Sequence, residues 1–340
     1  MSLKTSRWFN ILSPNRGFDD RIIDTSLYHL YSIWLFTFSD LKTILFPQTI
    51  FGILTALSQI QLGKVTSDDT DAYEVLYRIP IVMFWVWIHL LPVDIHNQQQ
   101  PNGILEDKIN KPWRPLPSNR CTLTQARYAM LFFYGLAAII SYQIGPLRWS
   151  ASIMALGTGY NSLGGSDVNP FVRNFIVSLG YAAFGLGALE IAQHDSLNFG
   201  SQGSIKLPSI PSLEAWVILL TLVILTTIQV QDMEDQEGDV LRGRRSLPLQ
   251  IGDGLTRCVT AVFMAIWGLL CPYFWGCGWF GYAIATPLAY LVALRSMVYR
   301  TVEHDKTTHR IWNMWIAGLY LIPLLSAEYH SGLGFTLETN

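Results

Sequence analysis

The chain has 340 residues, of which 50% are hydrophobic, 13% aromatic and 14% charged. Soluble domains carry roughly 25% charged residues, so the composition argues against a soluble enzyme. The net charge of −2 lacks the basic excess of a nucleic-acid-binding protein, and we expect no nucleic acid partner. The four cysteines form no C-x-x-C pair and have no histidine at zinc-finger spacing, so we interpret them as packing residues.

Apolar segments of helix length recur from about residue 33 to residue 326 without a polar linker. A transmembrane helix needs about 20 residues, and lipid permits only helices or closed barrels. The sequence therefore predicts one all-α integral membrane domain at residues 31–330, with an arm at 1–30 and a short tail at 331–340. Nine transmembrane helices are expected near 33–60, 79–97, 122–143, 147–161, 171–192, 212–232, 257–275, 276–296 and 310–327.

The basic residues predict an orientation for these helices. With nine spans, eighteen Lys and Arg residues fall on the side of the N-terminus and four on the other side. Basic residues accumulate in cytosolic loops, so the side of the N-terminus is predicted to face the cytosol. Residues 1–20 lack a continuous apolar stretch followed by a cleavage site, and no removable signal peptide is expected. The arm is then a cytosolic or interfacial segment, or a lid over a site.

Two basic residues inside or beside predicted spans have two interpretations each. Lys42 lies ten positions into the first span, where a basic side chain must reach the interface or find a partner. Asp40 is close enough in sequence to pair with it, and contact with an anionic substrate is the alternative. Arg173, at the start of the fifth span, fits either contact with an anionic substrate or an anchor at the cytosolic side.

The first polar loop runs from Asp94 to Arg120 and is rich in amides, carboxylates and basic residues. Pro101-Asn102-Gly103 predicts a turn that ends the preceding helix and resets its phase. The acids after this turn can face the same site as the amide before it, and the basic residues beyond would supply donors for a phosphate. An ordinary polar loop between helices is the alternative. The candidate site residues here are Asn97, Glu106, Asp107, Lys111 and Arg114.

The second polar loop, residues 229–249, continues from the sixth predicted helix. Asp232, Asp235 and Asp239 are spaced i, i+3, i+7 and therefore share one helical face. Three like charges repel, so we expect a cation between them, and Mg²⁺ is the natural candidate because it binds through a few carboxylates and substrate phosphates. The alternative is a solvated helix end. Acids at the end of a membrane span are costly, which favours the metal site.

Together the two loops resemble the paired aspartate-rich motifs of the UbiA superfamily of intramembrane prenyltransferases. That family's second motif has the form D-x-x-D-x-x-G-D-x-x-x-G-R-x-[ST]-L-P. Asn97 stands seventeen residues before Arg114, as the family's first-motif asparagine stands before its R-P-L triplet. The nine predicted helices agree as well, so the resemblance covers essentially the whole chain. The second motif is filled by Asp232, Asp235, Gly238, Asp239, Gly243, Arg244, Ser246, Leu247 and Pro248.

The first motif departs from the superfamily pattern. Counted from Asn97, the positions of the three family aspartates hold Gln98, Pro101 and Leu105, and an acidic pair follows at 106–107. The form N-Q-x(7)-E-D-x-x-N-K-P-W-R-P resembles the fungal branch of UbiA-type membrane-bound terpene cyclases, as does the segment TFSDLKTILFPQTIFGIL. This resemblance implies a reaction in which a linear prenyl diphosphate is ionised and cyclised.

From these residues and the resemblance we hypothesise a site that binds Mg²⁺ and a diphosphate. Mg²⁺ and a clamp of basic residues would stabilise the leaving diphosphate, which carries several negative charges, in a water-poor cavity. The candidate catalytic and metal-binding residues are Asn97, Glu106, Asp107, Asp232, Asp235 and Asp239. The candidate diphosphate-binding residues are Lys42, Lys111, Arg114, Arg173 and Arg244.

The carbocation left after ionisation needs electron-rich walls. The chain has 12 Trp, 15 Tyr and 17 Phe, ample for cation–π stabilisation, although packing is the favoured interpretation for any single one. The small-residue stretch at 180–188 is expected to let helices approach closely. Aromatic candidates in predicted helices are Trp85, Trp87, Phe132, Phe133, Tyr134, Tyr160, Tyr181, Phe184, Trp267, Tyr273, Phe274, Trp312 and Trp315.

Three functions remain open at this point. The leading interpretation is a membrane-bound terpene cyclase that uses Mg²⁺ and acts on farnesyl or geranylgeranyl diphosphate. The second is a prenyltransferase that moves the prenyl group to an aromatic or other small acceptor, and the third is a transporter or a non-catalytic scaffold. Clustering of the acids at one face, away from the membrane midplane, argues against transport. The expected partners are the prenyl diphosphate and the lipid bilayer of the endoplasmic reticulum, with no protein partner evident.

Overall fold

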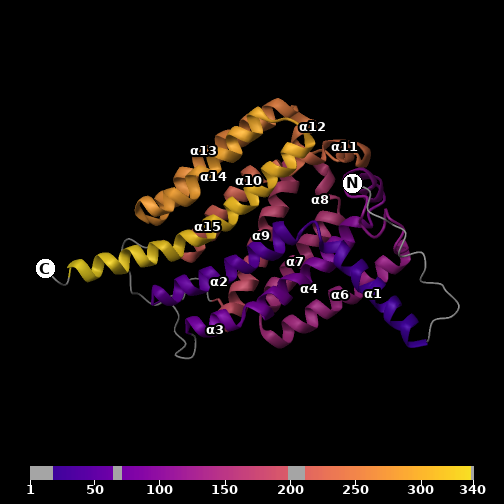
Figure 1. Ribbon diagram of the computed structural model, residues 1–340, viewed down its shortest axis with the longest axis horizontal. Coiled ribbons are helices and arrows are strands. Elements are labelled where there is room, and N and C mark those ends of the chain that lie inside the picture. Colours follow the sequence, from indigo (N-terminus) through magenta and orange to yellow (C-terminus); the bar gives the residue numbers. More distant parts are fainter. Residues whose placement is uncertain (1–17, 64–70, 198–210, 338–340) are drawn as a thin grey trace.

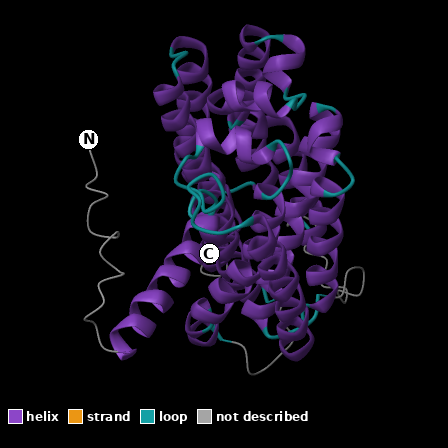
Figure 2. Ribbon diagram, turned by 90° about the vertical axis from the view of Figure 1, so that its right-hand side faces the viewer, coloured by secondary structure: helices purple, strands orange, loops and turns teal. Residues whose placement is uncertain are grey.

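The computed structural model describes residues 18–63, 71–197 and 211–337. Within these ranges every regular element is a helix, and no strand occurs in them (Figure 2). The predicted all-α class is therefore confirmed. Residues 1–17 of the predicted arm and 338–340 of the predicted tail lie outside the described residues. The division into arm, domain and tail stays a prediction, and α1 and α15 run across its two boundaries.

Long helices alternate with short ones that cap the ends of the bundle. The first half contains α1 (Phe18–Thr37), the π-helical η3 (Leu41–Leu45), α2 (Phe46–Gln61), α3 (Ala72–Tyr77), α4 (Ile79–Gln98), α5 (Gly103–Asn110), α6 (Leu123–Ile144), α7 (Leu147–Asn161) and α8 (Gly165–Val168). The second half contains α9 (Pro170–Gln193), α10 (Leu213–Thr227), the 3₁₀-helical η4 (Ile228–Val230), α11 (Asp232–Arg242), α12 (Leu247–Ile251), α13 (Asp253–Trp275), α14 (Gly278–Val298) and α15 (Val302–Leu337).

Seven helical segments within the described ranges are long and apolar enough to cross a membrane. They are Leu41–Gln61, Ile79–Gln98, Leu123–Ile144, Pro170–Gln193, Leu213–Val230, Asp253–Trp275 and Gly278–Val298. Helices α7 and α15 lie at the fourth and ninth predicted spans but outside this set. The 15 residues of α7 rise only about 22 Å, less than the hydrocarbon thickness of about 30 Å. The count of nine spans stays a prediction.

The first predicted span, 33–60, is wrong as a single helix. Helix α1 ends at Thr37, and the membrane-length segment begins at Leu41. Between them the Asp40 carbonyl accepts hydrogen bonds from the backbone N–H groups of Ile44 (2.8 Å) and Leu45 (3.3 Å), so the chain opens into a π-helical turn. Such turns frequently occur at functional sites. The hydropathy of residues 33–60 does not indicate this break.

Helix α9 is the central element of the bundle (Figure 1). It packs against α2, α4, α7, α8 and α10. Helices α13 and α14 run side by side and pack against α10 and α15, while α6 packs mainly against α4. The core is rich in large aromatic side chains, which bury much apolar surface each. The tryptophans with at most 2% exposure are Trp85, Trp216, Trp275, Trp312 and Trp315.

Glycines allow the helices around α9 to approach one another closely. A Cβ atom on Gly52 of α2 would lie 2.8 Å from the backbone of Ala188, and one on Gly187 would overlap the indole ring of Trp85. The predicted role of the small-residue stretch is therefore confirmed at these contacts. Gly180 differs, because a Cβ there would meet nothing within 4 Å.

Candidate active site

The two polar loops meet at one end of the bundle. Helix α4 ends at Gln98 and α5 begins at Gly103, so the predicted helix break at Pro101–Gly103 is confirmed. Asn110 of α5 then donates a hydrogen bond to the backbone carbonyl of Asp235 (3.2 Å) on α11. Gly238 makes this approach possible, because a Cβ there would overlap the Asn110 side chain.

Helix α11 ends in a glycine turn that positions a basic residue. Gly243 has a φ of 77°, a left-handed conformation that glycine adopts without strain. The N–H of Gly243 donates to the Val240 carbonyl (3.1 Å) and the N–H of Arg244 to the Asp239 carbonyl (3.0 Å), as in a Schellman motif. The turn returns Arg244 to Asp239, and their side chains form a 3.0 Å ion pair. The predicted acidic face of this helix is buried.

A cavity of about 170 Å³ extends from this charged end into the bundle, between η3, α4, α7 and α9. The structure brings seven of the eleven predicted site residues to its wall. These are Asn97, Glu106, Lys111, Arg114, Arg173, Asp235 and Arg244. The cavity therefore joins residues from both polar loops with a residue from the fifth predicted span.

Three of the predicted acids lie behind basic residues of the wall. Each acid forms a buried ion pair with a guanidinium group that lines the cavity, which fixes the position of that group. The pairs are Asp107 with Arg114 (2.9 Å), Asp232 with Arg173 (2.6 Å) and Asp239 with Arg244 (3.0 Å). On the wall itself, Asp235 lies 3.5 Å from Lys111. The side chains thus form an inner set of cations supported by an outer set of carboxylates.

Arg242 joins the two loops and was not among the predicted site residues. Its guanidinium donates hydrogen bonds to Glu106 (2.9 Å), Asn97 (3.1 Å) and Asp167 (3.1 Å). Burial raises the pKa of Glu106, but the combined effect of Arg244, Arg242 and nearby Lys111 is larger and brings the pKa down to about 2. This carboxylate therefore stays ionised. The spacing of Arg242 from the aspartates of α11 places it on their helical face, a signal that the sequence did contain.

Lys42 does not join this group. It does not line the cavity, and its electrostatic influence reaches Glu234 on α11. Asp40, which was expected to pair with Lys42, instead forms an ion pair with Arg114 (3.3 Å) and lines the cavity. The structure therefore supports neither interpretation of Lys42.

Away from the charged end the cavity wall is apolar. Among the aromatic candidates, Tyr181 and Phe184 line this part, Tyr160 lines the cavity close enough to Arg173 and Arg244 to interact electrostatically with both, and the others do not line it. Aromatic faces attract cations, so these three rings are suited to a carbocation. The aliphatic part of the wall includes Ile44, Leu90, Val93, Ile153, Leu156, Ile176, Val177 and Ile228.

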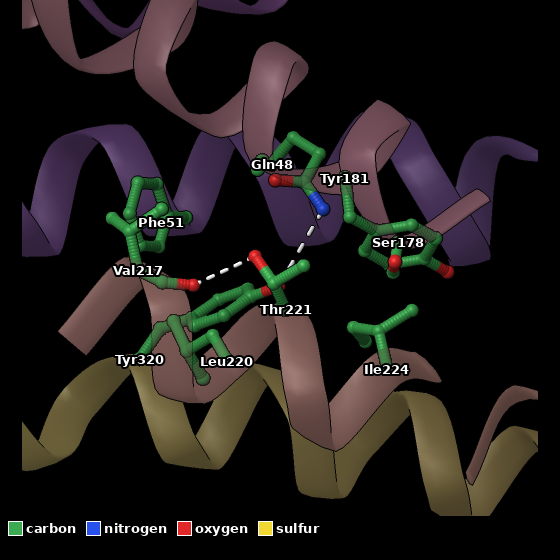
Figure 3. Close-up of a pocket in the computed structure, with 10 residues that line it drawn as sticks. Gln48, Phe51, Ser178, Tyr181, Val217, Leu220, Thr221, Ile224 and Tyr320 are labelled. Carbon is green, nitrogen blue, oxygen red and sulfur yellow. Dashed lines mark hydrogen bonds between the residues drawn. The ribbon is translucent and has the colours of Figure 1, made fainter. Parts of the chain in front are cut away.

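A second, smaller cavity adjoins the first. Figure 3 shows Gln48 and Phe51 of α2, Tyr181 of α9 and Tyr320 of α15 among the side chains around it. Its volume is about 20 Å³, room for about one water molecule. Tyr181 lines both cavities, and its hydroxyl is buried with no hydrogen-bond partner among the described residues. The ring of Tyr181 is therefore a common wall.

The donor groups fit Mg²⁺ at two of the aspartates. Carboxylate oxygens are ligands that Mg²⁺ prefers, usually one or two together with waters and substrate phosphates. Asp239 keeps a buried oxygen, Oδ2, without a hydrogen-bond partner in the described ranges. Asp235 lies on the wall beside Lys111. Among the described residues, no three Asp, Glu, His or Cys side chains lie close enough together to hold a metal ion by themselves. A Mg²⁺ ion at Asp235 and Asp239 would therefore need further ligands from a bound substrate.

Comparison with known proteins places the chain in a family. The model of the UbiA prenyltransferase family matches residues 104–319. The chain is 28% identical to somaliensene A/B synthase of Streptomyces somaliensis, over 87% of this chain and 91% of that protein. It is 31% identical to fumagillin beta-trans-bergamotene synthase of Aspergillus fumigatus, over 71% and 78%.

A solved structure shares the fold. A UbiA homologue from Archaeoglobus fulgidus, bound to GPP and Mg²⁺, superposes with a TM-score of 0.52 at 13% identity, covering 83% of this chain and 98% of that one. The expected resemblance to UbiA-type terpene cyclases is confirmed by the two synthases. With its apolar membrane-length helices, this chain is an integral membrane protein of the UbiA prenyltransferase family.

Proposed function

We propose that the chain is a membrane-bound terpene cyclase that ionises farnesyl or geranylgeranyl diphosphate with Mg²⁺ and cyclises the resulting allylic cation. The observation that carries the proposal is a set of buried guanidinium donors on the cavity wall. Nε of Arg114, Nε of Arg173 and Nη2 of Arg244 have no hydrogen-bond partner among the described residues. Buried donors are nearly always satisfied, so these are suited to the oxygens of an anion.

The two ends of the cavity match the two parts of a prenyl diphosphate. The isoprenoid chain contacts the apolar wall, and the diphosphate contacts four basic residues, Lys111, Arg114, Arg173 and Arg244. Asp107, Asp232 and Asp239 hold three of these cations in place and so reduce the reorganisation that accompanies departure of the leaving group. Asp235 and Asp239 would hold Mg²⁺, which would supply positive charge to the leaving diphosphate. Tyr160, Tyr181 and Phe184 then face the cation.

Cyclisation is preferred to prenyl transfer because two relatives that match most of this chain are terpene synthases. Prenyl transfer to a small acceptor is the second candidate, favoured by the match to the prenyltransferase family. The proposed location is the endoplasmic reticulum, with the charged end toward the cytosol, as the distribution of basic residues predicts.

An acceptor-free assay tests the proposal. Membranes that carry the chain are incubated with farnesyl or geranylgeranyl diphosphate and Mg²⁺, and both diphosphate release and terpene products are measured. We expect a cyclic terpene that disappears with EDTA and falls by about 100-fold or more in Asp239→Asn, because the variant loses a carboxylate that supports Arg244 and fits the metal. Glu237→Gln, an exposed position on the same helix, is the matched control and should keep wild-type turnover.

Two other results would contradict the proposal. If neither substrate gave a terpene, and an aromatic acceptor restored diphosphate release, the chain would be a prenyltransferase. Full turnover in Asp239→Asn, or in EDTA, would contradict the assignment of the metal.

A further inference from the structure

The cavity holds a pair of carboxyl groups that the ionisation step does not use. Asp94 of α4 is 7% exposed and lines the cavity, and its Oδ2 atom has no hydrogen-bond partner in the described part of the chain. Asp40, at the start of the π-helical turn, lines the same cavity, and the two carboxyl groups lie in hydrogen-bonding contact. Buried polar atoms without partners are rare, so this oxygen calls for an explanation.

The position of Asp94 differs from that of the proposed diphosphate site. Leu90, Val93, Asp94 and Asn97 are the residues through which α4 lines the cavity. Asp94 precedes Asn97 by three residues, which places it about 4.5 Å further from the charged end along the helix axis. It therefore lies where the polar wall meets the apolar wall, next to the space assigned to the isoprenoid chain.

Basic residues lie near both carboxyl groups. Arg114 is 3.3 Å from Asp40, and Arg114 and Lys111 both act electrostatically on Asp94. The other acids on the wall are already engaged, Glu106 with two arginines and Asp235 with Lys111. Asp94 is thus a wall carboxyl group with an oxygen that no described residue engages.

We infer that Asp94 accepts the proton that ends the cyclisation. The inference rests on the proposed function. The cyclised carbocation loses a proton from a carbon next to the cationic centre, the C–H electron pair forms the C=C bond of the product, and the proton binds to Oδ2 of Asp94. A C–H group beside a cationic carbon is a far stronger acid than a carboxylic acid, so transfer of its proton to a carboxylate is favourable. The released diphosphate, itself a base, takes the proton before the next turnover.

Asp94→Asn separates this role from ionisation. The amide has the shape of the carboxyl group and donates a hydrogen bond to Asp40, but its oxygen is a far weaker base than a carboxylate. Diphosphate release should stay within about threefold of wild type, while the ratio of terpene hydrocarbon to water-captured alcohol falls by about tenfold or more. If the asparagine variant does not fold, Asp94→Ser, which also bonds to Asp40 and is not a base, gives the same test.

Two further variants make the test specific. Asp40→Asn removes a partner of Arg114, so it should slow diphosphate release and leave the product ratio within about twofold, because Asp94 remains as the base. Glu190→Gln removes a buried carboxylate at the other end of α9, where Glu190 accepts a hydrogen bond from the Leu197 N–H (2.9 Å), and should keep the wild-type product ratio.

The outcomes distinguish the inference from the function on which it rests. An unchanged product ratio in Asp94→Asn overturns the inference, and so does a loss of diphosphate release in proportion to hydrocarbon in folded protein. Failure of the wild-type chain to release diphosphate without an acceptor overturns the proposed cyclisation. The wild-type assay is therefore done before the variants are measured.

Discussion

The charged end and the apolar end of the central cavity are built in opposite ways. At the charged end, side chains from α5, α9 and α11 are held by ion pairs of 2.6–3.5 Å, and cations on the wall have acids behind them. At the apolar end, Tyr181 separates two cavities, and its hydroxyl has no hydrogen-bond partner in the described residues. Directional contacts thus fix the first region, whereas the shapes of packed helices fix the second.

This difference has a functional consequence under the proposed function. A diphosphate is the same group in every prenyl substrate, so a rigid and directional site suits it. A folded isoprenoid chain differs between substrates, and its shape is set by a surface without directional contacts. Changes at the charged end should therefore alter the rate of ionisation, and changes at the apolar end should alter the products.

The largest effect is expected from Arg242→Met. The variant removes the bonds that join Asn97, Glu106 and Asp167, which belong to three different segments of the charged end. Removing one partner from a buried ion-pair network costs about 3 kcal/mol, and Glu106 and Asp167 keep only Arg244 as a partner. Diphosphate release should fall by about 100-fold, since the two loops lose one of their links. The free energy of unfolding in detergent and the rate of diphosphate release are the measurements.

Arg245→Met is the matched control for this change. Arg245 is three residues further along the chain and exposed. Its replacement should leave the free energy of unfolding and diphosphate release near the wild-type values. Equal losses in the two variants would show that general positive charge, and not the link between the loops, is what matters.

A smaller effect is expected from Lys111→Met, with Lys42→Met for comparison. Lys111 lines the cavity beside Asp235, whereas Lys42 does not line it. Loss of one charged hydrogen bond should raise the KM for the prenyl diphosphate by about tenfold or more in Lys111→Met. In Lys42→Met the KM should stay within about twofold. The same rise of KM in both variants would return Lys42 to the diphosphate site.

The sequence predicted the charged end better than the apolar end, for a physical reason. Acids and glycines at short spacings follow from the geometry of one helix and one turn, so the sequence alone could place Asp235, Asp239 and Arg244 near one another. The helix break before Glu106 was equally local. The π-helical turn at Leu41–Leu45, which contains Lys42, could not be predicted from hydropathy, and the role of Lys42 stays a prediction.

The cavity contour could not be predicted from the sequence. Its wall combines residues from position 40 to position 244, and the adjoining cavity adds Tyr320 from α15. Which of thirteen aromatic candidates face the cavity depends on how each helix is rotated about its axis. The hydrophobic periodicity did not indicate this rotation, because several central helices are apolar on all sides and their sequence patterns do not mark one buried face. Only Tyr160, Tyr181 and Phe184 reach the wall.

The smallest effect on ionisation is expected where helices touch far from any charge. In Gly187→Ala the added methyl group would overlap Trp85, whose indole N–H donates to Ser141 (2.8 Å), so α4 and α9 must move apart. Overpacking of this kind costs about 1–3 kcal/mol in the free energy of unfolding. Gly135→Ala is the control, because a Cβ there meets nothing within 4 Å and should stabilise α6 by about 0.5–1 kcal/mol.

The products of the Gly187→Ala variant test the contrast between the two ends directly. A shift of α9 against α4 near Gly187 changes the spacing of Phe184 and Leu90, which both line the cavity, while Arg173 at the other end of α9 should keep its ion pair with Asp232. Diphosphate release per folded molecule should then stay within about twofold, while the distribution of terpene products changes. If release fell and the product distribution did not change, the two ends would be mechanically coupled, and the charged end would depend on the packing around Trp85.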